Sequence, residues 1–310
     1  MNKDTVGLTS KTSAAARAHE SKRPDRLFLD PLASIYSSQD ADEVDASNGE
    51  ETSSAQRTRF RTKFANVVLR SSSLLNLGTG WLTGMYMRKI YLDIAVRTRF
   101  LDDIVQKNMT NVKQIVLLAC GGDFRPYRLP SLHTLAPSSC PTFYLLDVPH
   151  VLKYRQKCFT QLDMPATTPC SVVEIPGNLS NENWSRMLRE TGFDVYQPTL
   201  WLAEGFLHYL TEQQIALLFN RIRQLSLSKQ TCIAFDLVSS RFQSTMRRAV
   251  AHDIFQFALD DENDVHRIFS GLGCYDIECT SFQELGAMYG RKISRDRSFV
   301  VEAKMHPANT

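Results

Sequence analysis

The chain has 310 residues, with 36 Lys or Arg and 33 Asp or Glu, which gives a formal net charge of +3. This length favours one large α/β domain, or one domain with a lid, over several small domains. Basic and acidic residues are interspersed, which argues against a nucleic-acid partner. No apolar run approaches the roughly 20 residues of a membrane span, so no membrane partner is expected.

Cysteine usage and the N-terminus point to an intracellular protein. The seven cysteines form an odd set without a Cys-x-x-Cys pair. Several lie in apolar strand patterns, where a thiol behaves as a small hydrophobic group, and their spacing predicts no metal site. The N-terminus lacks the apolar segment of a secretory signal. We therefore expect a reducing, cytoplasmic location, and the sequence leaves the oligomeric state open.

The first part of the chain is expected to form a helical cap. Residues 1–12 are interpreted as a flexible leader, and residues 13–108 as the N-terminal cap or lid. An alanine-rich helix starts at residue 13 and leads into proline turns at Pro24 and Pro31. The acidic, Ser-rich residues 37–56 predict a mobile loop.

The second half of this cap, residues 57–108, places apolar and basic residues at helical spacing. Gly78, Gly80 and Gly84 are expected to interrupt these helices. The helices would pack over a cofactor rather than join a sheet. The apolar stretch 71–87 either lines a substrate pocket or belongs to the ordinary core.

From residue 109 to 310 the rhythm becomes strand, loop, helix, typical of a Rossmann-like domain. Strands are expected at 114–119, 142–147, 171–175, 198–203, 231–237, 274–279 and 296–303. Helices are expected at about 149–160, 181–191, 211–226, 243–259 and 281–289. This alternation predicts an α/β fold with a doubly wound, mainly parallel sheet, and the less regular end of the chain is compatible with an antiparallel edge strand.

Four strand ends carry small or charged residues at the position where open α/β sheets bind ligands. They are Cys120-Gly121-Gly122-Asp123 with Arg125, then Asp147, then Gly177-Asn178-Leu179, and finally Glu204-Gly205. A glycine turn can join a strand to a helix for steric reasons alone. Acids at three neighbouring strand ends are costly unless a ligand or partner compensates them, so a ligand site is favoured.

The first turn distinguishes between nucleotide cofactors. It lacks the GxGxxG pattern, because Ala119 stands at the first glycine position. Asp123 would repel the pyrophosphate of a dinucleotide. S-adenosylmethionine fits better, since it has an ammonium and a sulfonium but no phosphate. A carboxylate such as Asp147, one strand later, can accept hydrogen bonds from both ribose hydroxyls.

Five segments carry a family signature. They are residues 13–33 (SAAARAHESKRPDRLFLDPLA), 96–103 (VRTRFLDD), 115–129 (IVLLACGGDFRPYRL), 143–155 (FYLLDVPHVLKYR) and 198–210 (PTLWLAEGFLHYL). Through them the chain resembles the leucine carboxyl methyltransferase family, in particular its branch of small-molecule O-methyltransferases. The last third of the chain resembles the family mainly in rhythm. The resemblance implies a class I methyltransferase fold with S-adenosylmethionine as the methyl donor.

The resemblance also implies roles at the amino-acid end of the cofactor. Arg97 would pair with the methionine carboxylate, and Arg17 would be a second contact to it. Gly121 would let the backbone pass beneath the cofactor, with Asp123 nearby. Glu204 would lie near the methionine amino group, although it could instead cap a helix.

At the nucleoside end, the resemblance places Asp147 on the ribose hydroxyls and Asn178 with Leu179 around the adenine. This chain departs from the family pattern at Ala119, where glycine is usual, and at Gly122, where a larger residue is usual. It also has Asn178 in place of the usual aspartate. An asparagine can still accept a hydrogen bond from the adenine amino group, but without a charge.

The implied acceptor is a small-molecule carboxylate, which is ionised at neutral pH and needs no strong base. Catalysis would then depend on alignment and on exclusion of water. Candidates to hold the second acceptor oxygen are Arg125, Arg241 and His208, with Tyr209 shaping the pocket.

Each of these four candidates also has a plainer interpretation. Arg125 could pair with a neighbouring acid, Arg241 could be an exposed loop residue, and Tyr209 could belong to the core. His208 could instead act as a base toward a phenol or another hydroxyl.

Three hypotheses follow from the sequence. The first is an S-adenosylmethionine-dependent O-methyltransferase acting on a small-molecule carboxylate, as in secondary metabolism. The second is methyl esterification of a protein C-terminal carboxylate. The third is a catalytically silent binding module that keeps the fold, which the departures at Ala119 and Asn178 favour.

Overall fold

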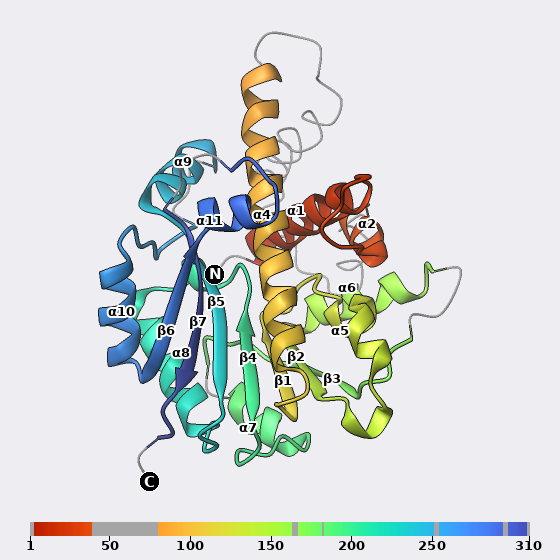
Figure 1. Ribbon diagram of the computed structural model, residues 1–310, viewed down its shortest axis with the longest axis vertical. Helices are drawn as coiled ribbons and strands as arrows, with labels where there is room; N and C mark the ends of the chain where they lie inside the picture. The colour runs from red at the N-terminus through yellow and green to blue at the C-terminus, as the bar shows by residue number, and fades with distance from the viewer. Residues whose placement is uncertain are drawn as a thin grey trace, which may run out of the picture.

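A seven-stranded sheet forms the centre of the molecule in the computed structural model, which describes residues 3–38, 80–162, 167–181, 183–250, 254–293 and 297–308 (Figure 1). The strands are β1 (Gln114–Leu118), β2 (Thr142–Asp147), β3 (Val172–Pro176), β4 (Thr199–Ala203), β5 (Cys232–Leu237), β6 (Cys274–Ser281) and β7 (Phe299–Met305). Their order in the sheet is β3-β2-β1-β4-β5-β7-β6. All seven strands predicted from the sequence are present, with small shifts at their ends.

Strands β1 to β5 run parallel, and the chain changes direction of winding at β1. Both β2 and β4 pair with β1, so the strand order reverses between β1 and β4. This reversal is the topological switch at which doubly wound sheets bind ligands. The antiparallel strand is β7, which pairs with β5 and β6. It therefore lies inside the sheet, and the expected edge position is taken by β6.

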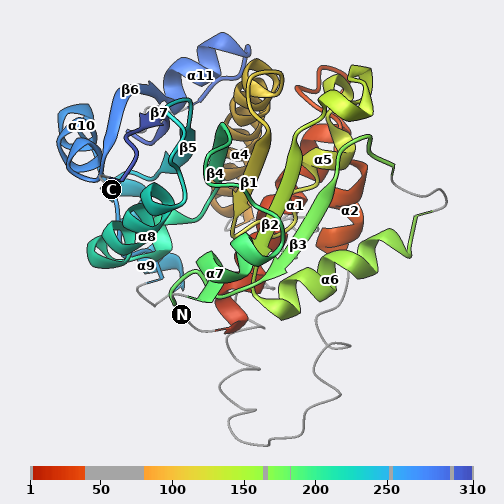
Figure 2. The ribbon, with the colours of Figure 1, turned by 90° about the horizontal axis from the view of Figure 1, so that it is seen from below.

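Helices cover both faces of the sheet (Figure 2). On one face α7 (Asn183–Glu190), α8 (Glu212–Gln224) and α10 (Glu262–Gly271) bury an apolar cluster that includes Trp184, Phe219 and Phe269. On the other face, the C-terminal half of α4 (Gly80–Asn108) and α11 (Phe282–Met288) pack on the alternate side chains of the same strands. Burial on both faces explains why the parallel strands are continuously apolar.

A helical cap stands over the C-terminal ends of the strands (Figure 1). It contains α1 (Lys3–Ser21), α2 (Pro31–Ser38), the N-terminal half of α4 and α9 (Ser240–Val250). Most of the segment predicted as a flexible leader is helical, because α1 begins at Lys3. Residues 39–79 lie outside the described residues. They include nearly all of the predicted mobile loop 37–56 and the first part of the apolar stretch 71–87.

Helix α4 joins the cap to the sheet layer. It begins at Gly80 and continues through Gly84, so the predicted interruption at Gly84 is wrong. A single glycine weakens a helix by only about 1 kcal/mol, which the packing along this long helix outweighs. Within the described part of the chain, neither α4 nor any other helix has the length and apolarity to cross a membrane.

Two differences from prediction concern residues 240–271. The helix expected at 243–259 lies at Ser240–Val250, and residues 254–259 are not helical. Their backbone bonds lie elsewhere, since the amides of Gln256 and Phe257 donate to the carbonyl of His208. Helix α10 was missed, although the side chain of Asp261 caps it by accepting from the amide of Asn263 at 2.7 Å.

The remaining two helices flank the first two strands. They are the short α5 (Arg125–Arg128) and α6 (Pro149–Phe159).

A contact between α2 and the turn after β1 fixes the cap on this side. Tyr36 of α2 is 1% exposed, and its ring fills the space above Gly122. Its carbonyl accepts a hydrogen bond from the Tyr154 hydroxyl at 2.8 Å. Tyr36 therefore occupies the volume that a larger residue at position 122 would need.

Gly122→Ala is expected to destabilise the protein. A Cβ atom at this position would lie 2.9 Å from Cδ1 of the Tyr36 ring, and overpacking of a buried site costs about 1–3 kcal/mol. Urea denaturation measures this change in the free energy of unfolding. Gly271→Ala is the matched control, because a Cβ there has open space around it. An equal effect of both substitutions would contradict the packing role of Tyr36.

Candidate functional site

A cavity of about 610 Å³, called here the main cavity, opens at the C-terminal ends of β1, β2, β3 and β4. The side chains and backbone of the turns after these strands form its floor, and α1 contributes to its wall. All eight residues predicted to bind a cofactor line it: Arg17, Arg97, Gly121, Asp123, Asp147, Asn178, Leu179 and Glu204. The structure therefore brings together residues that are far apart in the sequence.

The turn after β1 is tight and is held from two sides. Ala119 (φ 52°) and Gly121 (φ 45°) both adopt the left-handed conformation. For an alanine this conformation costs on the order of 1–2 kcal/mol, which explains why glycine is favoured at position 119. Buried Arg155 donates from Nη1 to the carbonyls of Gly121 (2.7 Å) and Asp123 (2.6 Å). These bonds keep the turn in its strained shape.

Arg155 was not singled out from the sequence. It lies within the segment FYLLDVPHVLKYR, and the signal available was a basic residue in the buried register of α6. Arg17 holds the same turn from the cap, since its Nη2 donates to the carbonyl of Gly122 and its Nε pairs with Asp30 at 3.0 Å. Two guanidinium groups from separate helices thus fix the floor of the main cavity.

Asp147 ends β2 and faces the main cavity while being 5% exposed. Its Oδ2 accepts from the amide of Gly121 and its Oδ1 from the amide of Val148, each at 2.7 Å. Burial raises the pKa of Asp147, and these two backbone hydrogen bonds act in the opposite direction. Each carboxylate oxygen keeps acceptor capacity for one more donor. The group can therefore accept two hydroxyls at once.

The turn after β3 forms the far wall of the main cavity. Asn178 accepts a hydrogen bond on Oδ1 from the amide of Ser180 at 2.9 Å, which fixes the orientation of its amide. Leu179 is buried and packs in the apolar cluster under the sheet. These two residues give this wall one polar and one apolar group.

Glu204 follows β4 and lies between two arginines. Its Oε1 accepts from Nε of Arg97 at 3.1 Å, and its Oε2 pairs with Nη2 of Arg125 at 2.6 Å. Burial acts to raise the pKa of Glu204, but the two guanidinium groups outweigh it and hold that pKa well below its usual range. Glu204 is thus an ionised carboxylate at the wall of the main cavity and not a helix cap.

Asp236 of β5 completes this group and was missed in the sequence. It is fully buried, and its Oδ2 accepts from Nη1 of Arg97 at 3.0 Å. The available signal was a single acid within the apolar strand CIAFDL, which is costly without a partner. Within the described part of the chain, Nη2 of Arg97 makes no hydrogen bond, and Arg97 lines the main cavity.

Arg125 is buried beneath the main cavity and is absent from its lining. Its Nε donates to Asp102 at 2.6 Å, its Nη1 pairs with Asp123, and its Nη2 pairs with Glu204. It is 1% exposed, so its donors are used within the protein. Arg241 is exposed at the start of α9 and lines neither cavity described here. The catalytic roles suggested for these two residues therefore stay predictions without a contact to the cavities.

A second cavity of about 130 Å³, called here the apolar cavity, adjoins the main cavity below the cap. The two cavities share five lining residues: Thr9, Ser13, Arg97, Gly205 and Tyr209. His208 lines the apolar cavity and is 4% exposed. His208 and Tyr209 both lie in the short 3-10 helix η4 (Leu207–Tyr209), directly after the β4 turn. The sequence thus correctly grouped these two residues near the strand end.

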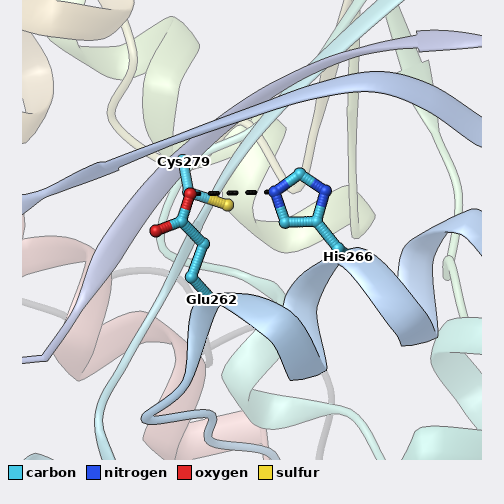
Figure 3. A group of neighbouring side chains, drawn as sticks. All are labelled: Glu262, His266 and Cys279. Atoms are coloured by element: carbon cyan, nitrogen blue, oxygen red, sulfur yellow. Dashed lines mark ion pairs between the residues drawn. The ribbon is translucent and has the colours of Figure 1, made fainter.

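One further group of potential ligand atoms lies at the edge of the sheet, away from both cavities. Glu262 and His266 are one turn apart on α10, and Cys279 lies on β6 beside them (Figure 3). The carboxylate and the imidazole are 3.7 Å apart, the geometry of an i,i+4 pair. Glu262 is exposed, and the group offers three ligand atoms. The carboxylate and the imidazole thus lie next to the half-buried thiol of Cys279.

Comparison with known proteins identifies the family. A model of the leucine carboxyl methyltransferase family matches residues 10–223, which include all of the strand ends that line the main cavity. The chain belongs to the leucine carboxyl methyltransferase family. The resemblance predicted from the five sequence segments is thereby confirmed.

Relatives in mycobacteria are provisionally named S-adenosyl-L-methionine-dependent methyltransferases. One from Mycolicibacterium gilvum is 31% identical over 94% of this chain and 89% of its own length. One from Mycolicibacterium paratuberculosis is 27% identical over 95% of this chain and 53% of its own length. One from Mycolicibacterium smegmatis is 31% identical over 72% of this chain and 64% of its own length. The chain therefore spans about half of the length of the second of these relatives and just under two thirds of the length of the third.

A solved structure supports the fold. The crystal structure of a DUF574 family protein from Streptomyces avermitilis superimposes with a TM-score of 0.55 at 13% identity, covering 71% of this chain and 86% of that one. At this identity the likeness concerns the fold alone. Together with the strand order, it confirms the predicted class I methyltransferase fold.

Arg125→Met is expected to lower the free energy of unfolding by about 3–5 kcal/mol, because it leaves buried carboxylates unpaired. Thermal or urea denaturation measures this loss. Arg241→Met is the matched control and should change stability by less than about 0.5 kcal/mol, since the side chain is exposed. An Arg125→Met variant of native stability would show that the ion pairs described above do not support the fold.

Proposed function

We propose that this protein is a methyltransferase that uses S-adenosylmethionine and transfers the methyl group to an oxygen atom of a small-molecule acceptor. The observation that carries this proposal is the convergence of eight predicted cofactor contacts on the main cavity. Membership of the leucine carboxyl methyltransferase family supports the same cofactor and the same reaction class. When bound, S-adenosylmethionine supplies a methyl group on a sulfonium sulfur.

The walls of the main cavity fit the nucleoside part of this cofactor. Asp147 has acceptor capacity left on both oxygens, which suits the two ribose hydroxyls. At Gly121 a Cβ atom would lie 3.3 Å from Cβ of Ser10, another lining residue, so a side chain there would crowd α1 at the edge of the main cavity. Asn178 and Leu179 offer one hydrogen-bonding group and one apolar surface for the adenine.

The opposite end fits the methionine part. Nη2 of Arg97 is the donor that remains for the carboxylate, while its other nitrogens are held by Glu204 and Asp236. Glu204 is ionised and lines the same wall, which suits the ammonium. Arg17, which also lines the cavity, would be the second contact to the carboxylate. The acids here favour a cationic ligand over one with phosphates.

Calorimetric titration tests the placement of the cofactor. Asp147→Ala removes a charge-assisted contact of about 1.5–3 kcal/mol, so the dissociation constant for S-adenosylmethionine should rise roughly 10- to 150-fold. Asp264→Ala, at an exposed aspartate of α10, is the control and should bind like the native protein. A melting curve checks that each variant is folded.

Two results of this titration would contradict the proposal. Native affinity in a folded Asp147→Ala variant would show that Asp147 does not contact the cofactor. If the native protein itself failed to bind, the silent-module hypothesis, which Ala119 and Asn178 favour, would replace the enzymatic one.

The apolar cavity is proposed as the site of the methyl acceptor. Arg97, Gly205 and Tyr209 line both cavities, so the methyl group would cross at this junction. The protein would contribute alignment of the acceptor oxygen with the methyl carbon and would exclude water by closure of the cap. The family resemblance favours a carboxylate as the acceptor group, and no strong base is needed in that case.

A protein C-terminal carboxylate is the rival acceptor. The apolar cavity measures about 130 Å³ and lies beneath the cap, which suits a small molecule better than a peptide tail. Incubation with methyl-labelled S-adenosylmethionine, either with a cell protein fraction or with a small-molecule extract, separates the two. We expect the label in the small-molecule fraction, and label found only on protein would reject the proposed acceptor class.

A further inference from the structure

The apolar cavity has the size of a single aromatic ring. An engineered apolar cavity of about 150 Å³ in another protein binds benzene, which sets the scale. Eight apolar side chains line the cavity here. Val238 follows β5 and Phe282 begins α11, and the other six are Met87, Ile90, Ile94, Phe242, Met246 and Phe255. These six come from α4, from α9 and from the segment after α9, so the cap encloses the cavity. Its occupant must therefore be mostly apolar.

The charged groups at this cavity disfavour an anion. Asp93 and Asp236 are both lining residues and are 6% and 0% exposed. The cation among the described lining residues is Arg97, which Asp236 and Glu204 already hold. Asp93 is paired with Nζ of Lys89 at 2.7 Å, and the remaining Nη2 of Arg97 is assigned above to the methionine carboxylate. A carboxylate entering here would therefore meet two buried acids, and the cation of the described lining would already be engaged. A neutral acceptor does not incur this repulsion.

His208 offers the polar contact that such a neutral acceptor needs. Neither of its ring nitrogens has a hydrogen-bond partner among the described residues, and Nδ1 is shielded from solvent. Buried polar atoms without partners are rare in proteins. The ring is held in place by Tyr209 and Phe255, whose centroids lie 4.3 and 4.5 Å away. This leaves an oriented imidazole beside an apolar cavity.

The charge state of His208 suits a hydrogen-bond acceptor. Burial, together with the nearby Arg97, lowers the pKa of His208 to about 3. The imidazole is therefore neutral at physiological pH, with one ring nitrogen able to accept a hydrogen bond. Burial also raises the pKa of Tyr209 to about 12, so its hydroxyl stays protonated. The Tyr209 hydroxyl is hydrogen-bonded to Thr9, so His208 is the neighbour that offers an acceptor.

We propose that the methyl acceptor is a neutral single-ring phenol, whose hydroxyl donates to His208 while its ring fills the apolar cavity. This inference rests on the proposed function, and it replaces the carboxylate that the family resemblance favours with a phenol hydroxyl as the acceptor. In the transfer step, the phenol oxygen forms a bond to the methyl carbon, and the electron pair of the breaking sulfur–methyl bond stays on sulfur. As the bond to the methyl carbon forms, the phenol oxygen becomes far more acidic than protonated His208, so its proton moves to His208, which later releases it to water. The products are a methyl ether and S-adenosylhomocysteine.

The first experiment offers the full-length protein methyl-labelled S-adenosylmethionine with either phenol or benzoate, which have the same ring. Mass spectrometry then detects anisole or methyl benzoate. We expect anisole as the main product. Methyl benzoate in excess, or no anisole, would overturn the inference.

Calorimetric measurement of S-adenosylmethionine binding in the same sample distinguishes failure of the proposed function from failure of the phenol inference. If the cofactor does not bind, the proposed function fails. If it binds and benzoate is methylated in preference, only the phenol inference fails.

The second experiment examines the role of His208. His208→Phe keeps a ring but removes both nitrogens, and kcat for phenol should fall about 100-fold or more, with cofactor affinity unchanged. His208→Gln keeps an acceptor oxygen and should lose less. His133→Phe, at an exposed histidine, is the control and should behave like the native protein.

Acidity of the phenol distinguishes proton transfer from a merely structural role. In His208→Phe, replacing phenol by the more acidic 2-fluorophenol should raise the rate more than it does in the native protein, because the variant lacks an internal proton acceptor. An equal effect of fluorine on both proteins would overturn the assignment of His208.

Discussion

A buried network of guanidinium and carboxylate groups is the constraint on which the site depends. Arg97 and Arg125 link α4, the turn after β1, the end of β4 and β5 through Glu204, Asp123 and Asp236. Burying such charges is costly unless every group is paired, so the network forms only when all of these elements are in place. The geometry of the strand ends is therefore fixed by the fold itself before a ligand binds.

This network divides the space above the sheet into two chemically different parts. The main cavity is lined by ionised and hydrogen-bonding groups, among them Asp147 and Arg97. The apolar cavity presents mainly aliphatic and aromatic walls. Arg97, Gly205 and Tyr209 line both cavities and mark the junction at which we propose that the methyl group is transferred. Such a transfer requires alignment of the reacting atoms and exclusion of water. The cap of α1, α4 and α9 provides this enclosure.

The sequence predicted those features that depend on local pattern. Continuous apolar strands and the small residues after them placed the sheet and the site at the strand ends, and the family segments supplied residue roles. Local pattern failed where tertiary contacts replace it. Residues 254–259 have helical composition, yet their amides bond to His208 and Val238. In the sequence, Asp236 is an isolated acid within an apolar strand. Its partner Arg97 lies on α4, far away in sequence, and only the fold brings the two together.

The sequence by itself determined the alternation of strands and helices, the turn at Gly121, the acid at Asp147 and membership of the family. Each of these depends on a local pattern of neighbouring residues. Only the tertiary structure decided what the charged residues do. The partners of Arg125 come from α4, from the turn after β1 and from the end of β4, and no spacing rule connects them. The same holds for His208, whose ring Nδ1 has no hydrogen-bond partner among the described residues because Phe255 and the cap pack around it. Long-range pairing is set by the three-dimensional path of the chain, which a linear pattern does not contain.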